Sequence, residues 1–181
     1  MITPLNNYFE EIIATIDLTE LKKIEDYILA TPIINPVVIK YCNADYEIKS
    51  KLEYAINYLH LHERTTLDIL DIGTAGGWFP YVCKMFNHNV YLHDLSIVNI
   101  DTTSLNYVNN LLAYDKILKL LQLTRHYGFK IEKNTPIKID RKFDIITGLS
   151  TCFHEDWDMT NWEFFLNDII QNLLYSKNVF L

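Results

Sequence analysis

The 181-residue sequence contains little glycine, proline or cysteine. Five glycines and five prolines, with a 49% share of hydrophobic residues, indicate a globular chain rather than a disordered one. The three cysteines, Cys42, Cys83 and Cys152, are odd in number and far apart, which argues against a disulfide framework and a zinc knuckle. We expect each to act as a small buried or half-buried hydrophobic residue.

An excess of positive charge is also absent. The formal net charge of -7 argues against a nucleic-acid partner, because lysine and arginine drive phosphate binding. No apolar stretch approaches the ~20 residues that span a bilayer, and the N-terminus does not resemble a signal peptide. We therefore expect a cytoplasmic protein that acts on a small molecule, without nucleic-acid or membrane partners and without a metal site.

The most informative segment combines a buried strand with a glycine-rich turn. It reads Leu67-Asp-Ile-Leu-Asp-Ile-Gly-Thr-Ala-Gly-Gly-Trp78, and a second strand, Asn89-Val-Tyr-Leu-His-Asp94, ends in an acid. In an open α/β sheet, a ligand binds beyond the carboxyl ends of the strands, where a tight turn brings the backbone close and an acid accepts the ribose hydroxyls. Because Asp94 lies 23 residues after Asp71, near the roughly 20 expected of such a unit, the pattern predicts a nucleoside site.

The order of glycines in the turn distinguishes between possible cofactors. A dinucleotide fingerprint requires G-x-G-x-x-G, but Ala75 occupies the second glycine position and is followed by Gly76 and Gly77. The order D-x-G-x-A-x-G resembles motif I of the class I S-adenosylmethionine-dependent methyltransferases, D-x-G-x-G-x-G, with Asp71, Gly73 and Gly77 in place. The departure at Ala75 adds one methyl group, which would narrow the turn or shift the ligand slightly.

The resemblance extends over residues 67–181. Phe143–Ser150 resembles the fourth strand of these enzymes, and Trp162–Leu174 resembles the helix after it. The resemblance implies a doubly wound, mostly parallel α/β sheet of the Rossmann-like type. It also implies methyl transfer from S-adenosylmethionine to a small-molecule, glycan-like or lipid-like acceptor. A non-catalytic nucleoside-binding module and an NAD(P)-dependent oxidoreductase remain as alternatives.

The resemblance also implies which residues hold the methyl donor. The Gly73–Gly77 turn would lie under the methionine moiety, Asp94 would bind the ribose, and Asn134, after the third strand, is our choice for the adenine. Ser150 and Thr151 would line the methyl-transfer side. The complete expected set is Asp71, Gly73, Thr74, Ala75, Gly76, Gly77, Trp78, Asp94, Leu95, Asn134, Ser150 and Thr151.

The segment after the fourth strand, residues 151–158, is where the acceptor should bind. If the acceptor is a hydroxyl or an ammonium, a base must remove a proton, and His154 has a suitable intrinsic pKa. The alternative for His154 is a loop histidine without a catalytic role. A nucleophilic role for Cys152 is less favoured. Glu155, Asp156 and Asp158 could hold a divalent ion, but a solvated acidic loop is the commoner case.

Hydrophobic periodicity predicts the remaining elements. Three helices should form a leader, residues 1–66, that caps the site, with a capping box at Asp17 and Glu20. The elements expected further along are a helix over residues 105–127 that stops at Gly128, a third strand at Phe129–Ile131, a capping box at Thr160 and Glu163, and a fifth strand from Asn178.

The sequence ends at Val179-Phe180-Leu181, where class I methyltransferases usually continue through further strands. An apolar strand edge with unpaired backbone groups invites pairing with another chain. We therefore expect either a truncated product or a sheet completed by self-association.

Overall fold

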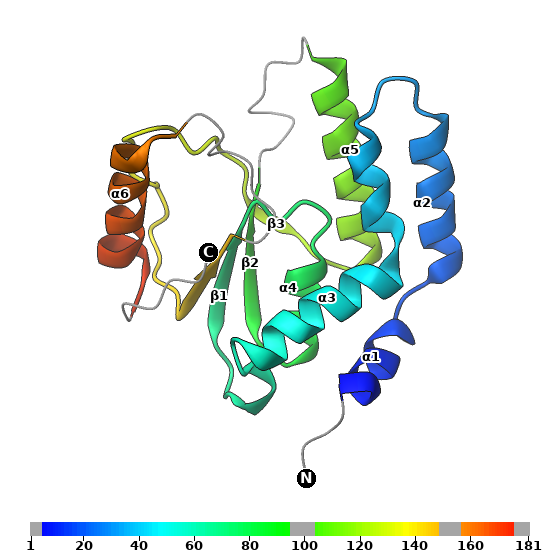
Figure 1. The fold of residues 1–181 in the computed structure, drawn as a ribbon, viewed down its shortest axis with the longest axis horizontal. Coiled ribbons are helices and arrows are strands. Elements are labelled where there is room, and N and C mark those ends of the chain that lie inside the picture. The colour runs from blue at the N-terminus through cyan, green and yellow to red at the C-terminus, as the bar shows by residue number, and fades with distance from the viewer. Residues whose placement is uncertain (1–4, 95–103, 149–156, 176–181) are drawn as a thin grey trace.

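The computed structural model describes residues 5–94, 104–148 and 157–175 (Figure 1). Four parallel strands form one sheet in the order β3-β2-β1-β4. The strands are β1 (Asp68–Ile72), β2 (Asn89–His93), β3 (Arg125–Tyr127) and β4 (Ile145–Thr147). Helices cover both faces of the sheet, which confirms the predicted doubly wound α/β fold.

The register of the strands brings their carboxyl ends together. Ile72, the last residue of β1, pairs with His93 of β2, and Asp71 pairs with Thr147 of β4. β1 is therefore flanked on both sides, and Ile69 to Ile72 are buried. The turn after β1 and the acid after β2 consequently emerge at the same edge of the sheet.

The leader packs against one face of the sheet (Figure 1). It comprises α1 (Leu5–Ile13), α2 (Leu18–Ala30), the 3-10 helix η1 (Pro36–Cys42), α3 (Ala44–Asn57) and the short 3-10 turn η2 (Leu61–Glu63). Asp17 caps α2 as predicted, because its side chain accepts from the Glu20 amide at 2.9 Å. The leader shares one hydrophobic core with α4 (Trp78–Met85) and α5 (Leu105–Leu120), so it is part of the same packed unit.

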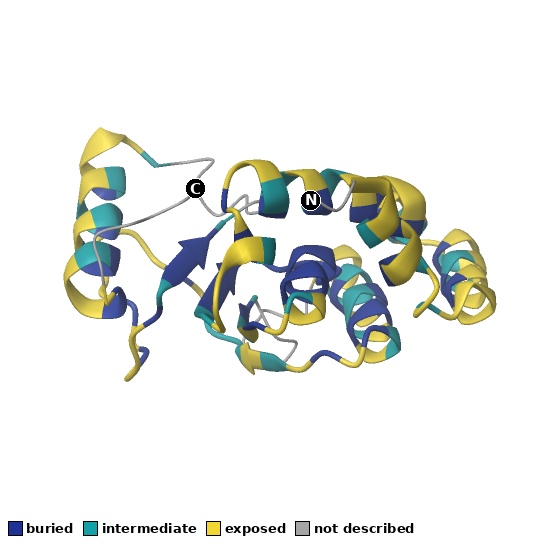
Figure 2. Cartoon of the chain, turned by 90° about the horizontal axis from the view of Figure 1, so that it is seen from below, coloured by how far each residue is buried: buried dark blue, intermediate teal, exposed yellow. Residues whose placement is uncertain are grey.

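The opposite face of the sheet carries α6 (Met159–Asp168), which continues into a π-helical turn over Ile169–Leu173. A second core cluster fills this interface, and it includes Leu70, Ile146 and Phe165. The helices direct buried residues toward the sheet and exposed residues outward, as Figure 2 shows. Among the described residues, no helix has the length and apolarity needed to cross a bilayer.

The strand predicted at Phe129–Ile131 is wrong. The third strand lies earlier, at Arg125–Tyr127, and α5 ends at Leu120 instead of continuing to Gly128. Gln122, with a left-handed φ of 52°, follows the C-cap of α5, and the Leu123 amide donates to the Leu118 carbonyl at 2.9 Å, so the helix ends here. Apolar spacing did not reveal this end because Leu121 and Leu123 stay buried in the same core after the helix has stopped.

The capping box predicted at Thr160 and Glu163 is also wrong. Asp158 is the N-cap of α6, and it forms a reciprocal pair with Asn161: the Asn161 amide donates to Asp158 Oδ1 at 3.0 Å, and the Asp158 amide donates to Asn161 Oδ1 at 3.1 Å. Thr160 lies inside the first turn. The fifth strand expected from Asn178 lies outside the described residues.

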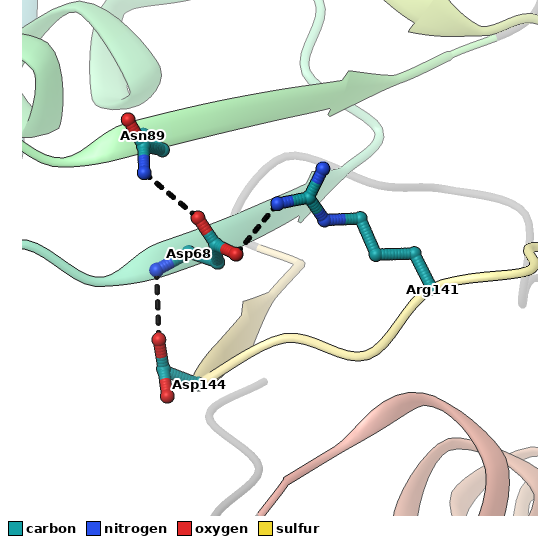
Figure 3. Close-up of polar contacts among 4 residues, drawn as sticks. All are labelled: Asp68, Asn89, Arg141 and Asp144. Atoms are coloured by element: carbon teal, nitrogen blue, oxygen red, sulfur yellow. Dashed lines mark hydrogen bonds and ion pairs between the residues drawn. The ribbon is translucent and has the colours of Figure 1, made fainter.

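Four polar residues join the amino ends of β1 and β2 to the segment before β4 (Figure 3). Asp68 at the start of β1 accepts from Arg141 Nη2 at 2.6 Å and from Asn89 Nδ2 at 2.9 Å, while its own amide donates to Asp144 Oδ2 at 2.8 Å. The Arg141 guanidinium also lies over the Tyr91 ring, 4.1 Å from its centre. These contacts tie β1 to β2 and to the segment that leads into β4, at the end of the sheet opposite the glycine-rich turn.

Candidate nucleoside site

The turn after β1 has an alternating left-handed backbone. Gly73, Ala75 and Gly77 have φ angles of 72°, 48° and 76°. The Gly73 amide donates to the His93 carbonyl at 2.8 Å, and the Gly77 amide donates to the Thr74 carbonyl at 2.9 Å. The turn is therefore attached to the end of β2 and folds back on itself before α4 begins at Trp78.

Gly77 has no space for a side chain. A Cβ atom built there would overlap the side chain of Leu118 and lie 3.0 Å from Leu123, and the φ of 76° disfavours every residue with a Cβ. α5 therefore packs directly against the backbone of the turn. This close approach gives a physical reason for the last glycine of the motif.

Asp71 organises the turn from inside the protein. Its carboxylate accepts from Thr147 Oγ1 at 2.7 Å and from Thr74 Oγ1 at 3.0 Å, which joins the end of β1 to β4 and to the turn. Only 5% of Asp71 is exposed, and burial raises the pKa of its carboxyl to about 6 against the opposing effect of the two hydroxyls. The acid that begins the motif is thus a buried support of the turn.

Asp94 joins the second strand to the turn. Its Oδ2 accepts a hydrogen bond of 2.7 Å from the amide of Ala75. The left-handed conformation of Ala75 directs this amide toward the acid, so the departure from the glycine motif preserves the contact. The acid after β2 and the turn after β1 therefore form one hydrogen-bonded unit.

A cavity of about 480 Å³ opens beside this unit. Its volume falls within the roughly 300–1,000 Å³ typical of small-molecule sites. Four segments line it: the strand ends, η1 with the residue before it, α5, and the loop after β3. The lining residues are Gly73, Ala75, His93, Asp94, Asn35, Val37, Lys40, Tyr41, Asn106, Tyr107, Asn110, Leu111, Tyr114, Phe129, Lys130 and Ile131.

The leader and α5 close the cavity together. The Asn35 amide donates to Asn110 Oδ1 at 2.9 Å, and the rings of Tyr41 and Tyr114 meet edge to face with centres 5.3 Å apart. Trp78 is buried, and its Nε1 donates to the Tyr41 carbonyl at 2.9 Å. The glycine-rich turn, the leader and α5 consequently hold one another in place around the site.

His93 is the last residue of β2, and it lies in the cavity wall. Its Nε2 is 3.0 Å from the Phe129 carbonyl, and the two rings lie edge to face with centres 4.7 Å apart. Only 4% of the residue is exposed, and burial lowers the pKa of the imidazole to about 4. The ring is therefore neutral at physiological pH.

Comparison with known proteins reveals similarity at the level of the fold. No family model matches the chain, and no curated protein matches it. An S-adenosylmethionine-dependent methyltransferase from Clostridium acetobutylicum aligns with a TM-score of 0.49 and 17% identity, over 71% of this chain and 46% of that one.

Two further solved structures are N-methyltransferases. A glycopeptide N-methyltransferase complexed with S-adenosyl-L-methionine gives a TM-score of 0.46 and 13% identity, over 70% of this chain and 50% of that one. Coclaurine N-methyltransferase bound to N-methylheliamine and SAH gives a TM-score of 0.40 and 12% identity, over 81% of this chain and 49% of that one. The chain spans about half the length of these structures. At such identities the likeness concerns the fold alone, and the chain's own strand order establishes that fold.

The structure brings together part of the expected cofactor set. Gly73, Ala75 and Asp94 line the cavity. Behind them, and outside the cavity wall, lie Asp71, Thr74, Gly76, Gly77 and Trp78. All five residues are buried, so we assign them to the support of the turn.

Other expected residues lie elsewhere. Asn134 is not part of the cavity wall, and its Oδ1 accepts from Asn161 Nδ2 at 3.3 Å. The loop residues that do line the cavity, Phe129 to Ile131, come shortly before it. The expected site residues outside the described part of the chain are Leu95, Ser150, Thr151 and His154. Among the described residues, no group of three or more His, Cys, Asp or Glu side chains could hold a metal ion.

The backbone of Ala75 leads to a prediction about stability. A residue with a Cβ costs about 1–2 kcal/mol in the left-handed region, whereas glycine adopts it freely but loses about 0.4–1 kcal/mol through the unfolded chain. Ala75→Gly is therefore expected to leave the free energy of unfolding unchanged or to raise it by up to about 1.6 kcal/mol, measured by urea denaturation. The control is Ala113→Gly in the middle of α5, which should lose stability; an equal loss at both positions would contradict the strain at Ala75.

Proposed function

We propose that the chain binds S-adenosylmethionine in this cavity and transfers its methyl group to a small-molecule, glycan-like or lipid-like acceptor. The observation that supports this most directly is the hydrogen bond between Asp94 and the Ala75 amide, because it joins the acid after β2 to the glycine-rich turn at the cavity wall. The turn would lie under the methionine moiety, and Asp94 would bind the ribose.

The surroundings of α4 favour this donor over a dinucleotide. A dinucleotide site directs the amino end of the helix at a pyrophosphate. Here the start of α4 is covered: Trp78 is 1% exposed, and a Cβ at Gly76 would lie only 3.2 Å from Tyr41. The cavity wall contains Gly73 and Ala75 but neither Gly76 nor Gly77. This arrangement suits a nucleoside without a phosphate at the helix.

The chemistry of a sulfonium donor suits a site built for positioning. Bound S-adenosylmethionine would supply a methyl group on a positively charged sulfur, which leaves as a neutral thioether and needs no metal or strong acid. The protein's contribution would be to hold donor and acceptor in a near-attack geometry, which lowers barriers by about 7–11 kcal/mol in favourable systems. The turn, Asp94 and the leader are the described elements that would do so.

Titration calorimetry tests the binding part of this proposal. S-adenosylmethionine and S-adenosylhomocysteine are expected to bind, and NAD is not. Binding of NAD in preference to both would support the oxidoreductase alternative instead. Release of S-adenosylhomocysteine in the presence of a cell-extract acceptor pool then separates an enzyme from a non-catalytic binding module.

The role of His154 is tested by kinetics. If His154 is the general base, His154→Ala should lower the turnover rate by about 100-fold or more and leave cofactor affinity nearly unchanged. His60→Ala is the matched control, because His60 is an exposed histidine at the amino end of η2. Equal losses of rate and affinity in His154→Ala, or no loss of either, would remove His154 from the mechanism.

A further inference from the structure

The charges around the cavity are unequal. Two lysines, Lys40 and Lys130, line it, and Asp94 is the one acid among its described lining residues. Asp94 already accepts a hydrogen bond from the Ala75 amide, and the His93 ring is neutral at physiological pH. This positive excess is local, because the whole chain has a formal net charge of -7. An excess of one sign in a concave site favours a ligand with a group of the opposite charge, here an anion.

The two lysines lie at different ends of the cavity. The sheet order places β2 between β1 and β3, so the turn after β1 and the loop after β3 lie on opposite sides of the end of β2. Lys130 belongs to the loop after β3, and Lys40 belongs to η1. The next residue of η1, Tyr41, packs against the turn, because a Cβ at Gly76 would lie 3.2 Å from its side chain. The Tyr41 carbonyl also accepts from Trp78 Nε1 at 2.9 Å, so Lys40 is the cation on the side of the turn.

The ammonium of Lys40 is accessible to a ligand. Lys40 is exposed and lines the cavity, so a ligand can reach its side chain from the solvent. Its Nζ lies over the ring of Tyr41, another lining residue, 4.8 Å from the ring centre. Within the described part of the chain, no carboxylate lies within 4.0 Å of this Nζ. An ammonium has three hydrogen-bond donors, so Lys40 has donors available for an anion.

S-adenosylmethionine has one anionic group, the carboxylate of its methionine moiety, and the proposed function places this moiety over the glycine-rich turn. On the basis of that function, we infer that Lys40 binds this carboxylate and thereby selects nucleosides that carry an amino-acid carboxylate over those that lack it. A lysine repels the sulfonium and the ammonium of the donor, so the carboxylate is the part that would turn toward η1. Lys40 is thus a specificity-determining residue for the donor.

Calorimetry with two matched ligands tests this role: S-adenosylhomocysteine and its decarboxylated form, which lacks only the carboxylate. The wild-type protein is expected to bind S-adenosylhomocysteine about fivefold or more tightly than the decarboxylated form. In Lys40→Met, which keeps an unbranched side chain without the charge, this preference should fall below about twofold, whereas Lys40→Arg should retain it. Lys130→Met is the matched control, because it removes the cation at the other end of the cavity, and it should keep the wild-type preference.

The outcomes separate this role of Lys40 from the proposed function. If S-adenosylhomocysteine binds but the wild type shows no preference, or if the preference persists in Lys40→Met or is lost equally in Lys130→Met, Lys40 does not select the carboxylate and the proposed function stands. If neither ligand binds the wild type, both fall. The wild type alone supplies a second measurement, because an ion pair at an exposed lysine weakens with salt. The preference should shrink between about 0.05 M and about 0.5 M NaCl, and a constant preference over this range would overturn the inference.

Discussion

Replacement of Asp71 by asparagine is expected to raise the free energy of unfolding at pH 8, by at most about 3 kcal/mol. Asparagine has nearly the same shape and keeps an oxygen that can accept from Thr147 or Thr74. It lacks the charge that burial disfavours. The upper limit follows from the change in the pKa of the carboxyl, from 3.8 for an unperturbed aspartate to about 6 in the folded protein. The loss of one of the two hydroxyl hydrogen bonds reduces the gain, because asparagine has only one accepting oxygen.

The size of this effect depends on pH. Between pH 4 and 6, the folded protein binds a proton at Asp71 more tightly than the unfolded chain does, so this group's contribution to stability decreases as the pH rises through that interval. The advantage of Asp71→Asn should therefore be fully present above pH 6 and disappear below pH 4. Urea denaturation at a series of pH values measures both limits.

Asp68 offers a matched control on the same strand. Burial raises the pKa of its carboxyl, but the hydrogen bonds from Arg141 and Asn89 outweigh burial and lower the pKa overall. Asp68→Asn should consequently lose stability at neutral pH, and the loss should shrink as the pH falls below the ordinary range of an aspartate. Identical pH profiles for the two variants would contradict the opposite environments assigned to the two acids.

The strand, turn and acid of the site could be predicted from sequence because their determinants are local. A buried run before Gly73, and a second run that ends in Asp94, fix two parallel strands whose carboxyl ends meet. The left-handed conformation of Gly77 depends partly on its contact with α5. It could nevertheless be predicted, because a glycine at this position of the motif already indicates a tight turn. For these elements, spacing along the chain and proximity in the folded protein coincide.

The wall of the cavity could not be predicted in the same way, because it depends on segments that are distant in sequence. Asn35 and Asn110 meet across 75 residues, and Thr147 reaches Asp71 across 76. The polar residues Asn106 and Asn110 lie four apart on one helix, and this spacing was the available signal for a polar face on α5. Nothing in the sequence indicated which element that face would meet.

Two errors have a common cause, namely that a pattern continued past the end of its element. The apolar residues that extended the predicted helix toward Gly128 belong to the connection after α5, where Leu123 remains in the core. The third strand was then placed at Phe129–Ile131, after its actual position at Arg125–Tyr127. The helix region ends at Gln122, which has a positive φ. Glycine or asparagine usually occupies such a position, so the glutamine gave no signal of the helix end.

Removal of the Asp94 side chain is expected to weaken S-adenosylmethionine binding by tenfold or more. Each hydrogen bond to a charged group contributes about 1.5–3 kcal/mol, and the proposed ribose contact uses the carboxylate. The structure adds a second effect, because Asp94→Ala also leaves the Ala75 amide without its 2.7 Å acceptor and loosens the turn. Titration calorimetry on the folded variant measures the combined loss.

Asp94→Asn separates these two effects. Its side-chain oxygen can still accept from the Ala75 amide, so the turn should persist, while the charge that strengthens the ribose bonds is gone. Affinity in Asp94→Asn should therefore lie between those of the wild type and Asp94→Ala, and Asp140→Ala, at an exposed acid, should bind as the wild type does. Wild-type affinity in both Asp94 variants, with the fold intact by circular dichroism, would show that Asp94 does not contact the ribose, and the nucleoside would then have to be held by other residues of the cavity wall.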